Sequence, residues 1–129
     1  MVTALNSATV LTGPRILAVD DDPLTRHLMD IVFSTYIPNG SVTVAHGAER
    51  AIELMASSEF DVLVTDIDMP GLSGFELIDR VREENPKFPI VIHSGNGKDR
   101  MRTVAPDVQI VEKGRAGIKS LVEAVLAAI

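Results

Sequence analysis

The residues best suited to chemistry in this sequence are carboxylates that directly follow two short apolar runs. Asp66 follows the run 62–65, and Asp20 and Asp21 follow the run 16–19. A continuous run rich in β-branched residues is typical of a strand that is buried on both faces of a parallel sheet. Because open α/β folds place their sites outside the carboxyl ends of the strands, these acids predict a functional site.

The three acids are suited to phosphoryl transfer. Carboxylates brought close together repel one another, so protons, a cation or a lysine must offset the repulsion. Mg²⁺ fits best, because it takes oxygen ligands, keeps several waters and is commonly completed by a phosphate. Asp66 is then the candidate nucleophile, since a carboxylate can form an aspartyl phosphate. Asp20 and Asp21 would hold the metal, which neutralises charge on the phosphoryl group.

Two further polar residues follow apolar runs nearer the C-terminus. Ser94 comes shortly after the run 89–92, and Lys113 follows the run 108–112. Lys113 would pair with phosphoryl oxygens as a mobile point charge. The hydroxyl of Ser94 would donate a hydrogen bond to the new phosphate.

The elements that must position these residues alternate between strands and helices. Strands are expected over 16–19, 41–45, 61–65, 89–92 and 108–112. Helices are expected from 23 to before 38 and over 48–55, 74–85, 98–104 and 118–129. The helix over 98–104 has the poorest pattern, and Pro106 follows it, so we expect it to be reduced. Right-handed crossovers put the helices on both faces and bring all the strand exits to one edge, which predicts a doubly wound α/β fold.

Two of the expected helices show the clearest signals. Asp22 followed by Pro23 is the N-cap and N1 arrangement that starts a helix. Four apolar residues then recur at helical spacing: Leu24, Leu28, Ile31 and Val32. The last helix carries one apolar stripe, made by Ile118, Leu121, Val122, Val125 and Ile129.

Composition restricts the classes of protein that fit. The chain has 129 residues, a formal net charge of -6 and no cysteine. Its length suits one domain, its charge argues against direct binding of nucleic acid, and it has neither disulfides nor thiol chemistry. No apolar run approaches the roughly 20 residues that span a bilayer, and no secretory signal is present, so a cytoplasmic protein is the simplest interpretation. Residues 1–13 are expected to be a flexible tail and residues 14–129 the domain.

Four linked motifs resemble the receiver domain of bacterial two-component response regulators. They are Val19-Asp20-Asp21-Asp22-Pro23, Thr65-Asp66-Ile67-Asp68-Met69-Pro70-Gly71-Leu72-Ser73-Gly74, Ser94-Gly95 and Lys113, in the family's order and with similar gaps. The resemblance covers the chain from Arg15 to the C-terminus. It implies a flavodoxin-like five-stranded sheet in the order 2-1-3-4-5 with five helices, an arrangement for which a receiver protein is a standard example.

The resemblance also implies a role for each site residue. Asp66 would accept a phosphoryl group from a histidine kinase or a histidine phosphotransfer protein, and Ser94 and Lys113 would bind the phosphate. Mg²⁺ would be held by Asp21, Asp66 and the main-chain carbonyl of Asp68, with Asp20 acting through water. Such a domain is a signalling module rather than an enzyme. Its output would pass through protein contacts, either to a downstream partner or to an effector domain outside this sequence.

The sequence departs from the family's pattern around Lys113. The family usually follows this lysine with a proline joined by a cis bond, whereas Gly114 stands here. A non-proline cis bond costs about 2.5 to 4 kcal/mol, so either the bond is trans and holds Lys113 differently, or strain is tolerated. Ile110 occupies a position where the family often has an aromatic residue, which moves together with the hydroxyl residue that corresponds to Ser94 here. These departures affect the surface through which the family usually contacts its partners, built on the fourth helix, the fifth strand and the fifth helix, more than the phosphorylation site.

Two other functions fit part of the pattern. Asp66-Ile67-Asp68 also resembles the Asp-x-Asp motif of haloacid-dehalogenase-type phosphatases, although that motif usually lies on the first strand. A receiver-like interaction module that is never phosphorylated is the other alternative. The carboxylate of Asp68, if it lies beside the phosphorylation site, is hypothesised to alter metal affinity or dephosphorylation. His27, His46 and His93 lack metal-ligand spacing and are interpreted as structural or surface residues.

Overall fold

The computed structural model describes residues 13–95, 106–114 and 117–129. The strands are β1 (Arg15–Val19), β2 (Ser41–Ala45), β3 (Val62–Thr65), β4 (Ile90–Ser94) and β5 (Gln109–Glu112). The helices are α2 (Pro23–Tyr36), α3 (Ala48–Ser57), α4 (Gly74–Glu84) and α5 (Gly117–Ala128). All strand pairs are parallel and the order is β2-β1-β3-β4-β5. The predicted doubly wound α/β fold is therefore confirmed.

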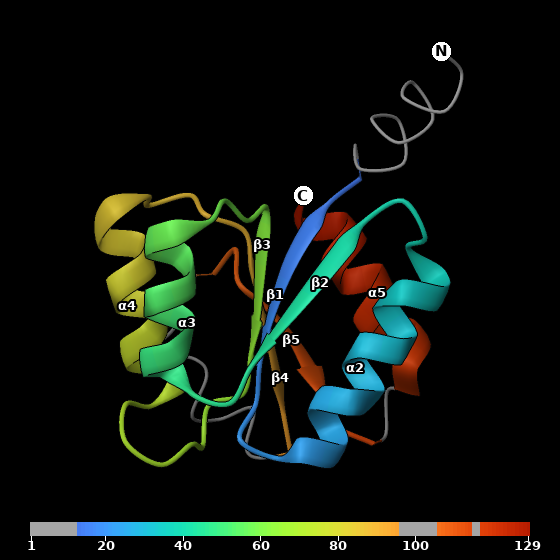
Figure 1. Ribbon diagram of the computed structural model, residues 1–129, viewed down its shortest axis with the longest axis horizontal. Coiled ribbons are helices and arrows are strands. Elements are labelled where there is room, and N and C mark those ends of the chain that lie inside the picture. Colours follow the sequence, from blue (N-terminus) through green and yellow to red (C-terminus); the bar gives the residue numbers. More distant parts are fainter. Residues whose placement is uncertain (1–12, 96–105, 115–116) are drawn as a thin grey trace.

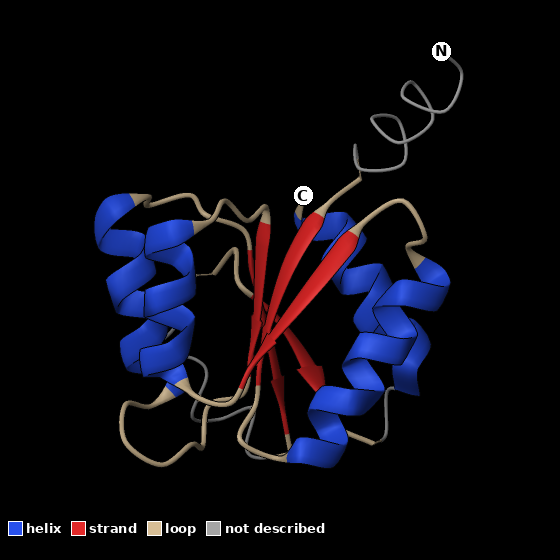
Figure 2. Cartoon of the chain, viewed as in Figure 1, coloured by secondary structure: helices blue, strands red, loops and turns tan. Residues whose placement is uncertain are grey.

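Helices cover both faces of the sheet. Figures 1 and 2 show α3 and α4 on one side and α2 and α5 on the other. Alternate residues of the central strands pack into these two layers: Leu63 of β3 joins the cluster under α3 and α4, and Val64 joins the cluster under α2 and α5. All four residues of β3 are buried, as expected for an internal strand of a parallel sheet. Because β3 is buried on both faces, it is held firmly in the sheet, and this fixes where the chain leaves the sheet at Asp66.

The helix α2 forms where predicted, but of the four apolar residues at helical spacing only Val32 is buried. Met29, Val32 and Phe33 face the sheet and are almost completely buried. Leu24 and Ile31 remain 74% and 50% exposed. The helix is apolar on two sides, and the path of the chain from β1 decides which side meets the sheet.

The helix α4 begins beside the end of β3. Ser73 and Glu76 form a capping box, in which the Ser73 hydroxyl accepts from the Glu76 N–H and the Glu76 carboxylate accepts from the Ser73 N–H. Gly74 lies so close to the chain after β3 that a Cβ atom there would stand 2.0 Å from the main-chain oxygen of Asp66. Its N–H donates to the carbonyl of Ile67 at 2.9 Å. The start of α4 therefore holds the turn that contains Asp66.

Two expectations fall on residues beyond the described ranges. The helix expected over 98–104 lies there, as do the first twelve residues of the expected tail. Gly13 is described, and its N–H donates to the carbonyl of Asn39 at 2.9 Å. Within the described ranges, no helix combines the length and the hydropathy needed to cross a bilayer.

Candidate functional site

Asp66 lies directly after β3 and is 6% exposed. Its Oδ1 accepts a hydrogen bond of 2.8 Å from the N–H of Ile67, and its Oδ2 accepts one of 3.0 Å from Nζ of Lys113. The hydroxyl of Thr65 donates to the main-chain carbonyl of Asp66 at 2.8 Å. Both the backbone and the carboxylate of Asp66 are thus held in one orientation at the edge of the sheet.

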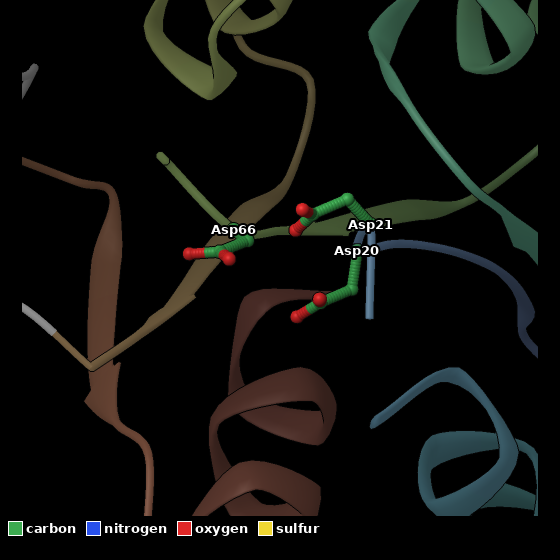
Figure 3. A group of neighbouring side chains, drawn as sticks. All are labelled: Asp20, Asp21 and Asp66. Carbon is green, nitrogen blue, oxygen red and sulfur yellow. The ribbon is translucent and has the colours of Figure 1, made fainter. Parts of the chain in front are cut away.

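Asp20 and Asp21 lie in the loop between β1 and α2. Asp20 is 1% exposed, and its Oδ1 accepts from the N–H of Asp22 at 2.9 Å. Asp21 is exposed. One carboxylate oxygen from each of Asp20, Asp21 and Asp66 lies within 4.8 Å of the other two. Figure 3 shows the side chains of Asp20 and Asp21 extending from adjacent positions toward Asp66.

Lys113 joins two of these acids. Its Nζ lies 2.7 Å from Oδ2 of Asp20 and 3.0 Å from Oδ2 of Asp66. Burial raises the pKa of Asp20 above its ordinary value, against the opposing hydrogen bond from Lys113. Burial lowers the pKa of Lys113, but its bonds to Asp20 and Asp66 outweigh this and raise the pKa above its ordinary value. The lysine is therefore a cation that balances part of the carboxylate charge.

The chain reaches this geometry without a cis bond after Lys113. Among the described residues no peptide bond is cis, and Gly114 adopts a φ of 79°. Proline fixes φ near −65° and could not take this conformation, whereas glycine takes it readily. Of the two arrangements that the sequence left open, the trans bond is the one present, and Lys113 still reaches Asp66.

The other predicted site residues lie near the same edge or in its loops. Ser94 ends β4 and is 2% exposed, and its carbonyl accepts from the N–H of Lys113 at 2.9 Å. Asp68 is exposed in the loop after Asp66. Ile110 is partly buried against the cluster under α3 and α4. The structure thus brings Asp20, Asp21, Asp66 and Lys113 into direct proximity.

Two further residues lie near this edge: Arg26, which the sequence did not single out, and His93, which it placed among the structural or surface residues. Arg26, on α2, donates from Nη1 to the main-chain carbonyl of Asp20 at 2.9 Å. His93, next to Ser94, is half-buried, and burial lowers its pKa to about 4. A basic residue one helical turn after an acidic N-cap is a weak signal that could have drawn attention to Arg26. His93 occupies a strand position that carries no comparable signal.

The cluster is suited to a hard divalent cation. Three carboxylates from two loops provide oxygen ligands of the type that Mg²⁺ prefers. The buried Asp20 and Asp66 have charge to be balanced, and Asp21 is open to solvent on the same side. The residues present therefore fit a hard divalent cation such as Mg²⁺.

Comparison with known proteins identifies the family. The model of the response regulator receiver domain matches residues 16–113. The chain is 37% identical over 91 residues to the sensor histidine kinase TmoS of Ectopseudomonas mendocina, which covers 69% of this chain and 9% of that protein. It is 30% identical over 86 residues to the transcriptional regulatory protein FixJ of Bradyrhizobium diazoefficiens, covering 67% of this chain and 41% of FixJ. The chain thus spans less than half the length of these relatives.

Solved structures agree in fold. A response regulator receiver protein from Sinorhizobium medicae has a TM-score of 0.82 and 27% identity, and the match covers 92% of this chain and 95% of that one. The response regulator TrrA from Thermotoga maritima, solved in complex with Mg²⁺ and BeF, has a TM-score of 0.76 and 25% identity, covering 90% and 99%. With its sheet order, its acidic cluster and these matches, the chain belongs to the response regulator receiver domain family.

Proposed function

We propose that this receiver domain is switched by phosphorylation of Asp66. The observation that carries the proposal is the placement of the Asp66 carboxylate, which is held between Asp20, Asp21 and Lys113 at the edge of the sheet. A carboxylate surrounded by further acids and one amine suits charge-balanced acceptance of a phosphoryl group.

The transfer follows from these contacts. One carboxylate oxygen of Asp66 attacks the phosphorus of a phosphohistidine. The new O–P bond forms as the P–N bond breaks, and the histidine nitrogen keeps the electron pair. Nζ of Lys113 can leave Asp66 and pair with a phosphoryl oxygen, because the product carries its charge there. The hydroxyl of Ser94, one strand away, donates to the same group.

Mg²⁺ is the proposed cofactor. Asp21, Asp66 and the main-chain carbonyl of Asp68 would hold it, with Asp20 acting through water. When bound, the ion neutralises phosphoryl charge. The acidic cluster supports this assignment, as does the Mg²⁺ in the related TrrA complex. Without a divalent ion, Asp20, Asp21 and Asp66 would keep repelling the incoming phosphate.

The proposed phosphodonor is a histidine kinase or a histidine phosphotransfer protein. The relatives include both a sensor kinase and a transcriptional regulator, which supports a place in a two-component pathway. We assign this activity to residues 14–129 and place the protein in the cytoplasm, where such kinases present their phosphohistidine. The output would pass through protein contacts, to a separate partner or to an effector domain outside this sequence.

Intact-mass measurement after incubation with acetyl phosphate and Mg²⁺ tests the proposal. We expect a gain of one phosphate, lost when Mg²⁺ is chelated and absent in Asp66→Asn. The control Asp79→Asn removes one carboxylate from the exposed surface of α4 and should keep the gain. A wild-type protein that gains no phosphate at saturating donor would instead be a receiver-like interaction module.

The same preparation tests for phosphatase activity. A haloacid-dehalogenase-type enzyme would turn over p-nitrophenyl phosphate steadily. We expect no such turnover, because Asp66 follows the third strand along the chain, whereas the phosphatase motif usually lies on the first.

A further inference from the structure

The backbone around Asp21 is fastened on both sides. On one side, the N–H of Asp20 donates to the carbonyl of Ala45 on β2 at 3.1 Å. On the other, the carboxylate of Asp22 accepts from the N–H of Leu24 at 3.3 Å and from the hydroxyl of Thr25 at 2.7 Å. Asp21 itself is exposed, so its orientation depends on these neighbours rather than on burial.

Arg26 fastens the peptide that joins Asp20 to Asp21. Its Nη1 donates to the main-chain oxygen of Asp20 at 2.9 Å. That oxygen and the N–H of Asp21 belong to one planar unit, so holding the oxygen also sets the direction in which Asp21 leaves the loop. The guanidinium is half-buried and is carried by α2, whose start is fixed by the Asp22 cap. The contact therefore links a rigid helix to two of the three clustered carboxylates.

We propose that Arg26 is a positioning residue for the metal-binding acids. It holds the Asp20–Asp21 peptide so that both carboxylates point toward Asp66 before a cation arrives. This inference rests on the metal site of the proposed function, and it adds a residue that does not touch the ion. Partners that orient metal ligands commonly change metal affinity about 10-fold to 100-fold when they are removed.

The charge of Arg26 works in the opposite direction. A guanidinium close to the acids repels a divalent cation, so its removal would tighten binding of Mg²⁺ if charge were its only contribution. Positioning predicts weaker binding instead. The sign of the change therefore distinguishes the two roles.

Titration of the full chain with Mg²⁺ alone, followed by calorimetry, tests the inference. We expect Arg26→Met to bind Mg²⁺ about tenfold more weakly than the wild type. Arg26→Lys should also bind Mg²⁺ more weakly. The lysine keeps the positive charge, but its side chain is one bond shorter and does not reach the carbonyl of Asp20 in the same way. Arg50→Met is the matched control: Arg50 is exposed on α3 and pairs with Glu53 at 3.1 Å, and its loss should leave the affinity unchanged.

Two further measurements separate positioning from folding. Urea unfolding without Mg²⁺ should give similar midpoints for the wild type and Arg26→Lys. Backbone ¹⁵N relaxation should show greater motion at the amide of Asp21 in Arg26→Lys than in the wild type. If Arg26→Met does not fold, the Mg²⁺ affinity of Arg26→Lys tests the inference instead, with weaker binding expected. Unchanged or tighter binding of Mg²⁺ in the folded variants overturns the inference, as does a wild type that does not bind Mg²⁺.

Failure of the proposed function would look different. If the wild type binds Mg²⁺ and Arg26→Met binds it weakly, but acetyl phosphate adds nothing to Asp66, the inference holds and phosphorylation is refuted. If Asp66 is phosphorylated and the Arg26 variants bind Mg²⁺ like the wild type, only the inference fails.

Discussion

At the scale of single residues, the site consists of three carboxylates and one lysine whose positions are set by the surrounding backbone. Lys113 contacts two acids that come from different strands, at 2.7 and 3.0 Å. The motifs predicted which residues meet, because parallel strands deliver their exits to one edge. They did not predict the hydrogen bonds that orient each carboxylate, because such bonds depend on backbone positions that are distant in sequence.

Gly114 shows how one residue adapts the loop after Lys113. Its φ of 79° is costly for a residue with a side chain, by about 1–2 kcal/mol. We therefore expect Gly114→Ala to lower the free energy of unfolding in urea by about that amount. Gly95→Ala is the control, because its φ is not positive and its new Cβ would lie 4.0 Å from Cδ of Lys113, an ordinary contact. Equal stabilities of the two variants would contradict the strain argument.

Asp68 places an additional carboxylate in the loop after Asp66, the proposed phosphoacceptor. If it lies close enough to act on the bound ion, Asp68→Asn should weaken Mg²⁺ binding about threefold, the effect of an exposed charge interaction of roughly 0.6 kcal/mol. Calorimetry measures the affinity, and loss of phosphate with time, followed by intact mass, measures the lifetime. Unchanged affinity together with an unchanged lifetime would refute a role for this side chain.

At the scale of elements, α2 illustrates the difference between predicting a helix and predicting its buried face. The start signal and the spacing of apolar residues predicted the helix correctly. The helix is apolar on more than one side, however, and local pattern alone does not select between them. The contact with the sheet, made by Met29, Val32 and Phe33, made that selection.

This difference gives a prediction for stability. Met29→Ala should lower the free energy of unfolding by about 2–5 kcal/mol, because Met29 is 2% exposed and its loss leaves a cavity. Leu24→Ala should change it by less than about 0.5 kcal/mol, since Leu24 is 74% exposed. Urea denaturation of both variants checks this. A larger loss for Leu24→Ala than for Met29→Ala would show that α2 packs through its other face.

At the scale of the whole molecule, arginine–carboxylate pairs tie distant segments together and make stability depend on pH. Hydrogen bonds from Arg15 hold the pKa of Asp61 below its ordinary value, and those from Arg82 do the same for Asp107. These carboxylates take up protons less readily in the folded state than in the unfolded chain. The stability that they contribute is therefore present above about pH 4 and is lost as the pH falls through their lower folded values.

Asp61→Asn should reveal this dependence. Asp61 accepts two hydrogen bonds from the Arg15 side chain, at 2.9 and 3.0 Å. We expect the variant to be less stable than the wild type at pH 7 and to lose stability less steeply below pH 4, so that the two curves converge in acid. Urea unfolding across this pH range measures both curves, with Asp79→Asn as a control for the change in charge. Parallel curves would contradict the assignment.

The amino-acid sequence was enough to predict the fold class, the order of strands and helices along the chain, and the acids and lysine that gather at one edge. It could do so because buried strands, turns and helix caps have local signatures, and because parallel strands share an exit edge. Three features emerged only from the folded arrangement of the chain: the buried face of α2, the trans bond before Gly114 and the hydrogen bond from Arg26 to the carbonyl of Asp20. Each of these depends on where distant backbone segments come to lie, which no local pattern specifies.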